Sequence, residues 1–166
     1  MESYECIKME KEEFLDRVRH YFDASPVGVL IFNEKLEMVY FNDSVLGYFE
    51  KDVDLSKKLF GNVFHCENVY ATEKECGTDQ RCFRCKIRNS LLEAFQRSRS
   101  IYDIHVNKKY IVKNEVKSKW FNINMVPLEY NGLRYIKLEM QDVSEEIAKK
   151  IEEEISCIVK DLCENG

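Results

Sequence analysis

The chain has 166 residues, of which 45% are hydrophobic and 12% aromatic, and these values fit one packed domain with a helical extension rather than a disordered chain. Its formal net charge of −5 gives no general attraction to nucleic acid or to anionic lipid. The longest apolar run, Val27 to Phe32, is far shorter than the roughly 20 residues of a membrane-spanning helix, and the N-terminus has no signal-peptide pattern. We therefore expect a cytoplasmic protein.

The first predicted elements are a helix and a β-hairpin. Apolar side chains recur at helical spacing from Lys11 to Phe22, and Ser25-Pro26 ends the pattern. Val27–Phe32 then has the apolar character of a buried strand, and Met38–Phe41 predicts the strand that returns beside it.

Short helices and then a longer helix are expected next. The Asn-Asp pair at 42–43 can cap a helical segment from Ser44 to Phe49. Beyond Lys51 no regular period is visible until Ile87–Arg97, whose apolar residues share one helical face.

Three further strands and a terminal helix complete the prediction. The strands are Ile101–Val106 with its continuation Tyr110–Val112, then Trp120–Leu128, and then Leu133–Met140. Asn131-Gly132 between the last two is a strong hairpin signal.

A helix is expected to start at Ser144, which is followed by two glutamates. Its apolar positions form a regular stripe: Ile147, Ile151, Ile155, Ile158 and Leu162. Such a stripe packs either on its own domain or on a second copy of the chain, and the pattern allows both.

The densest chemistry lies in a cysteine cluster made of Cys66, Cys76, Cys82 and Cys85. Four converging thiolates repel one another unless a cation or cluster lies between them, and Gly77 can take the positive φ of a tight chelating turn. In a reducing compartment such cysteines indicate metal ligands or redox thiols before disulfides. The pattern fits a tetrahedral Zn²⁺ site or an iron–sulfur cluster, and the order of the cysteines does not choose between them.

Several neighbours bear on this predicted metal site. His65 is a weaker alternative ligand, because adjacent side chains usually diverge. Nearby basic side chains could offset thiolate charge: Arg81, Arg84, Lys86 and Arg88. The other three cysteines are expected to be structural or incidental thiols: Cys6, Cys157 and Cys163.

Three segments resemble PAS sensory domains. The run from Phe22 to Val29 is similar to the usual PAS opening, and Tyr40–Asp43 resembles the segment that follows the second PAS strand. Asp142-Val143-Ser144 resembles the Asp-x-Ser/Thr signature that joins PAS domains to signalling helices. The resemblance covers roughly residues 11 to 150.

The resemblance implies an α+β fold, with a five-stranded antiparallel sheet, helices on one face, an N-terminal helix and a C-terminal signalling helix. The cysteine segment matches, position by position, a subset of bacterial PAS sensors with a Cys-x9-Cys-Gly-x4-Cys-x2-Cys pattern. Other PAS sensors hold an oxygen-labile [4Fe–4S] cluster on four cysteines with a different spacing. The expected units are an N-terminal helix at 1–22, a PAS domain at 23–143 with the cysteine segment at 61–86, and a signalling helix at 144–166.

These patterns predict a sensor rather than an enzyme. No phosphate-binding loop, nucleophile elbow or His-Glu-x-x-His pair is present. The predicted function is a cytoplasmic PAS module that senses oxygen or redox state at a four-cysteine metal centre, [4Fe–4S] favoured over Zn²⁺. Its expected partners are a second copy, through the terminal helices, and a downstream kinase or regulator. The alternatives are a zinc-stapled interaction domain without sensing, and a small-molecule receptor using the PAS cavity.

Overall fold

Five antiparallel strands form one sheet in the order β2-β1-β5-β4-β3. The computed structural model describes residues 2–164, with side chains described from residue 10. This sheet confirms the fold class predicted from the sequence. The strands are β1 Gly28–Asn33, β2 Met38–Phe41, β3 Ile101–Val112, β4 Glu115–Tyr130 and β5 Leu133–Asp142.

The helices precede, connect and follow these strands. They are α1 Glu2–Phe22, α2 Asp43–Tyr48, α3 Phe60–Val63, α4 Glu67–Thr72, the 3-10 helix η1 Gln80–Arg84, α5 Lys86–Arg97 and α6 Ser144–Glu164. The helix α1 extends from Glu2, within the expected unit 1–22 and well before Lys11, where the apolar periodicity begins. The segment beyond Lys51, where periodicity predicts no element, contains α3, α4 and η1, all too short to show a helical period.

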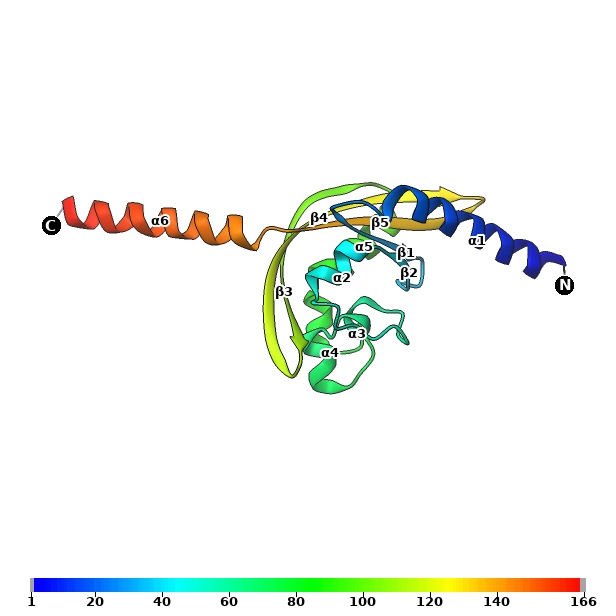
Figure 1. The fold of residues 1–166 in the computed structure, drawn as a ribbon, viewed down its shortest axis with the longest axis horizontal. Helices are drawn as coiled ribbons and strands as arrows, with labels where there is room; N and C mark the ends of the chain where they lie inside the picture. Colours follow the sequence, from blue (N-terminus) through cyan, green and yellow to red (C-terminus); the bar gives the residue numbers. More distant parts are fainter. Residues whose placement is uncertain (1, 165–166) are drawn as a thin grey trace.

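Apolar side chains are buried on both faces of the sheet. Leu30 and Phe32 of β1 point into the main core, which α2, α3 and α5 cover. Val29 and Ile31 alternate with them and pack on the opposite face, against Phe14 and other apolar residues of α1. Figure 1 shows α1 on one side of the sheet and α2 to α5 on the other.

Two tight turns determine the register of β3, β4 and β5. Asn131 and Gly132 have φ values of 48° and 76°, so the predicted hairpin turn is confirmed. Lys113 and Asn114 form a second turn, with φ values of 48° and 65°. This turn joins β3 directly to β4. The pairing of the two strands is unbroken from Ile104 to Val112, so β3 lacks the expected interruption between Val106 and Tyr110.

Asn42 connects elements on both faces of the sheet. Its side-chain oxygen accepts hydrogen bonds from the backbone N–H groups of Val29, at 3.0 Å, and Val45. Its amide donates to the carbonyl oxygens of Phe22 and Val27. The polar side chain is 2% exposed and is fully used in these bonds.

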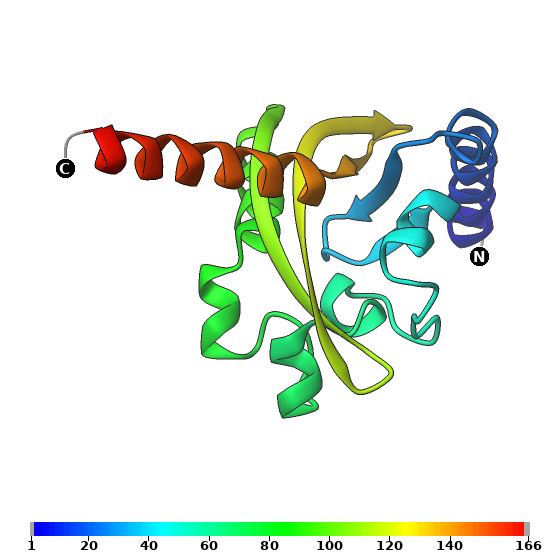
Figure 2. The same cartoon turned by 60° about the vertical axis from the view of Figure 1, so that its left-hand side comes forward.

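The terminal helix α6 leaves the end of β5 and projects beyond the sheet, as Figures 1 and 2 show. None of its described side chains is buried. The exposed apolar residues of its stripe include Ile151, Ile155, Ile158 and Leu162. Among the described helices, none is both long enough and apolar enough to cross a bilayer.

Candidate metal centre

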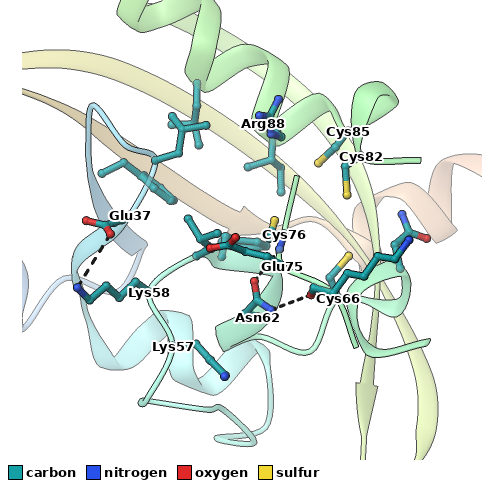
Figure 3. A pocket seen from close by; sticks show the side chains of 18 of the residues that line it. Glu37, Lys57, Lys58, Asn62, Cys66, Glu75, Cys76, Cys82, Cys85 and Arg88 are labelled. Atoms are coloured by element: carbon teal, nitrogen blue, oxygen red, sulfur yellow. Dashed lines mark hydrogen bonds and ion pairs between the residues drawn. The ribbon is translucent and has the colours of Figure 1, made fainter. Parts of the chain in front are cut away.

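The four cysteines of the cluster line one cavity of about 740 Å³. Cys66 precedes α4, Cys76 lies in the following loop, Cys82 belongs to η1 and Cys85 precedes α5. Cys66 and Cys82 are buried, while the other two are partly exposed. Figure 3 shows the labelled thiols around this cavity, which we call the cysteine cavity.

Cys76 is positioned by α3. Asn62 accepts a hydrogen bond from the Cys76 backbone N–H at 2.8 Å and donates to the Lys74 carbonyl oxygen at 3.2 Å. The absence of a side chain at Gly61 lets the thiol approach, because a Cβ there would lie 2.8 Å from Cys76 Sγ. Burial is the main reason that the pKa of the Cys76 thiol is raised.

The residue after Cys76 makes the tight turn that the sequence predicts. Gly77 has φ +97°, a conformation that other residues rarely adopt. A Cβ at Gly77 would also lie 2.7 Å from Nε of Arg88, a residue of α5 that lines the cysteine cavity. The turn therefore needs glycine both for its backbone angle and for its packing.

The Cys82–Cys85 pair is held by η1. The Asp79 side chain accepts a hydrogen bond from the backbone N–H of Arg81 and so caps η1. The Cys85 N–H donates to the Cys82 carbonyl oxygen at 3.1 Å. Cys85 is also the N-cap residue of the 12-residue helix α5, whose N-terminus favours negative charge.

Lys108 of β3 reaches into the cysteine cavity. Its Nζ donates a hydrogen bond to Cys66 Sγ at 2.9 Å and lies 5.6 Å from the centre of the Phe60 ring. The side chain is 8% exposed. Burial by itself would lower the pKa of Lys108, but the negative charge of Cys66, Cys85 and Cys76 reverses the shift, and the net change is upward.

The structure brings the four predicted ligands to one cavity without forming a closed metal site. Among the described residues, no three His, Cys, Asp or Glu side chains are grouped closely enough to hold a metal ion. Metal binding by the four cysteines therefore stays a prediction. The residues fit a metal centre in two respects: four cysteine sulfurs line one cavity, and the Lys108 amine donates a hydrogen bond to one of them.

The other sequence candidates lie in different places. His65 is 3.5 Å from the Asp52 carboxylate, and it does not line the cysteine cavity. Arg81, Arg84 and Lys86 line a neighbouring depression beside Cys66 and Cys85. Cys157 and Cys163 are exposed on α6, and the side chain of Cys6 lies outside the described residues.

Lys108 is the residue that the sequence reasoning missed. It lies beyond α5, far along the chain from the cysteines. A signal was nonetheless present, because the period of a strand places Lys108 on the same face as Val106, Tyr110 and Val112, all of which are buried. A lysine in a row of core residues indicates a buried partner for its charge.

A five-stranded antiparallel sheet in the order β2-β1-β5-β4-β3, with short helices and one longer helix between β2 and β3, defines a PAS fold. Known structures agree with this assignment. The chain is similar to the PAS domain of Bordetella pertussis BvgS, with a TM-score of 0.53 and 16% identity over 87% of this chain and 98% of that one.

Two longer proteins contain the same fold. One is the protein chain in the crystal structure of the phage VqmA–DPO complex, with a TM-score of 0.55 and 15% identity over 92% of this chain and 62% of that chain. The other is an RNA-binding light-oxygen-voltage receptor, with a TM-score of 0.53 and 10% identity over 93% of this chain and 39% of that chain. No protein-family model matches the sequence, and no curated protein matches it.

Proposed function

We propose that the chain is a bacterial cytoplasmic PAS sensor module, without catalytic activity, in which Cys66, Cys76, Cys82 and Cys85 bind a metal centre. The supporting observation is that all four thiols line one cavity, into which a buried lysine amine also points. We favour an iron–sulfur cluster over zinc. Such a cluster, when bound, supplies redox chemistry that oxygen or a change of redox state can alter.

The apolar side of the cysteine cavity suits such a centre. Phe60, Ile87 and Leu91 line it, and all three are buried. An apolar surround limits the access of water and raises the influence of each nearby charge on the centre.

The cysteine segment is attached to the sheet through β3. Cys66 forms a β-bridge with Tyr110, and the Ile111 N–H donates to the His65 carbonyl oxygen at 2.9 Å. A rearrangement of the segment would therefore act on β3. In the register of the hairpin, Lys108 of β3 faces Lys119 of β4.

From β4 the same change can reach the start of α6. Lys119 Nζ lies 2.9 Å from a carboxylate oxygen of Asp142, and the other oxygen accepts hydrogen bonds from the N–H and hydroxyl of Ser144. The Trp120 N–H donates to the Ser144 hydroxyl oxygen at 3.0 Å. The loss or oxidation of the centre would bias these contacts, provided that the two states of the metal site favour different helix arrangements.

The exposed helix α6 is the proposed output. Its apolar stripe suits pairing with the same stripe of a second copy, because the interface of a two-fold dimer uses the same surface of both subunits. The paired helices would then contact a downstream kinase or regulator protein. Nucleic acid and membrane are not proposed as partners, given the net charge of −5.

The test is anaerobic purification followed by metal analysis, a visible spectrum and light scattering. About four irons per chain, with a brown absorption that air bleaches, would support a [4Fe–4S] sensor. Cys82→Ser should abolish metal binding and change the oligomeric state or partner binding. Cys157→Ser, which changes an exposed cysteine outside the cavity, is the matched control for metal content. If Cys82→Ser loses the metal and leaves assembly unchanged, the switch is refuted.

A second candidate is an interaction domain that does not sense, stapled by Zn²⁺ and dimeric through α6. The exposed apolar stripe supports this candidate as well as the first. One zinc per chain, no colour, and assembly independent of oxygen would favour it. A small molecule that co-purifies in the cavity, with no metal, would instead favour a receptor.

A further inference from the structure

The strongest unexplained feature of the molecule is the burial of Lys108. Among the described residues, the buried polar or charged side chains are Asn42 and Lys108. Asn42 is fully hydrogen-bonded to backbone groups and has a structural role. Lys108 instead donates to a cysteine sulfur inside the cysteine cavity.

An ammonium group in the core is costly unless a negative partner compensates it. The carboxylates that line the cavity belong to Glu37, Glu73 and Glu75, and no ion pair joins any of them to Lys108. The groups that face Lys108 at short range are the Cys66 sulfur and the Phe60 ring. Four thiolates around a divalent metal, or around a cluster of charge 2+, would carry a net double negative charge, which would give Lys108 an anionic partner.

We propose that Lys108 is the fixed counter-charge of the four-cysteine centre and that it determines how tightly the site holds an anionic metal–thiolate group. This inference rests on the proposed metal binding. Lys108 does not ligate the metal: it donates to the ligand Cys66 and neutralises part of the charge of the group. Arg88, which lines the same cavity from α5, adds a second and more exposed cation.

The position of Lys108 also couples the charge to the sheet. Its neighbour Tyr110, two residues along β3, forms the β-bridge with Cys66. The backbone of β3 and the amine of Lys108 therefore hold Cys66 at two points, so the direction of the thiol is fixed before a metal binds. Pre-positioning of a ligand by an outer residue is worth roughly 10–100-fold in metal affinity.

The experiment compares Lys108→Met with Lys109→Met. Both variants remove one positive charge, but Lys109 is the exposed neighbour on the opposite face of β3. Methionine fills the lysine volume with an apolar chain, so the fold should survive. Zn²⁺ alone is the probe, and its affinity is measured by competition with a chromophoric chelator under anaerobic conditions.

We expect Lys108→Met to lower Zn²⁺ affinity roughly 10–100-fold, while Lys109→Met changes it less than about threefold. Lys108→Arg, which keeps the charge, should retain most of the affinity. In chelator, metal-free Lys108→Met should still unfold in one cooperative transition, which shows that a lower Zn²⁺ affinity is not a loss of the fold. With iron–sulfur loading, its reduction potential should fall, since the positive charge favours the more negative reduced state.

Equal Zn²⁺ affinity in Lys108→Met and Lys109→Met would overturn the counter-charge inference and leave the metal site intact. A wild type that binds neither Zn²⁺ nor iron would refute the proposed function and this inference together. If Lys108→Met does not fold, Lys108→Gln replaces it under the same criteria. The two failures are therefore distinguished by the behaviour of the wild-type protein.

Discussion

Gly61 gives the sharpest test of how α3 positions Cys76. A Cβ at this position would lie 2.8 Å from Cys76 Sγ and 3.0 Å from a methyl group of Val69. Ordinary contact needs about 3.5 Å or more, so Gly61→Ala must displace the thiol by more than about half an ångström. Metal–ligand distances tolerate about 0.2 Å, so a metal bound as proposed by the four cysteines would lose Cys76 as a ligand.

Gly61→Ala should also change the stability of the fold. Overpacking costs about 1–3 kcal/mol, and replacing a helical glycine by alanine returns about 0.5–1 kcal/mol. Gly61→Ala should therefore lower the free energy of unfolding of the metal-free protein by about 1 kcal/mol. Gly47→Ala is the matched control, because Gly47 lies in α2 with nothing within 4 Å of a Cβ, and this variant should be slightly stabilised.

The assays are urea unfolding in chelator and Zn²⁺ affinity by chelator competition. Gly61→Ala should be less stable than Gly47→Ala and should bind Zn²⁺ at least about tenfold more weakly. If Gly61→Ala and Gly47→Ala have the same stability and the same Zn²⁺ affinity, the inference that Cys76 packs closely against Gly61 of α3 is refuted.

Three further outcomes follow from the hydrogen bonds and from α6. Asn42→Ala should lower the free energy of unfolding by about 2–4 kcal/mol, measured by urea titration, because it leaves buried backbone groups unpaired. Burial raises the pKa of Asp142, but hydrogen bonds from Ser144 and Lys119 together outweigh burial and hold this pKa below its usual range. The ionised carboxylate therefore stabilises the fold above about pH 4, and this stabilisation is lost as the pH falls through the lower pKa of the folded state. Asp142→Asn should therefore reduce the acid sensitivity of the melting temperature. Ile155→Glu should convert a dimer to a monomer in light scattering, while Ser156→Glu should not.

Each of these outcomes can fail separately. A loss below about 1 kcal/mol in Asn42→Ala would mean that water replaces its bonds. If the melting temperature of Asp142→Asn falls at acid pH as steeply as that of the wild type, Asp142 is not ionised in the contact with Ser144. A wild-type chain that is monomeric at high concentration would remove the homodimer from the proposed function.

The sequence allowed most of the sheet to be predicted, because strand period and turn chemistry are local signals. The residue types of Asn131-Gly132 predict a turn, and the positive φ values of both residues confirm it. The turn at Lys113-Asn114 has similar positive φ values but contains no glycine, so the residue types do not predict it. Lys108 and Lys109 also interrupt the apolar pattern of β3, and this hid the continuity of the strand.

The cysteine cavity was only partly predictable. Gly77 next to Cys76 indicated a turn with positive φ, and its φ of +97° confirms this. The contact of Gly61 with Cys76, and that of Lys108 with Cys66, join segments far apart in the chain, and no local pattern reports such contacts. Whether the thiols bind iron, zinc or neither is chemistry that spacing alone leaves open.

The strand order has a consequence for how the molecule folds. The hairpins β1–β2, β3–β4 and β4–β5 join neighbours in sequence, whereas β1 pairs with β5, as in Gly28 with Met140. Local hairpins form quickly, and we expect the non-local β1–β5 pairing to form late. The cysteines lie in the long loop that this pairing closes, so a metal bound before closure would shorten that loop and speed the final step.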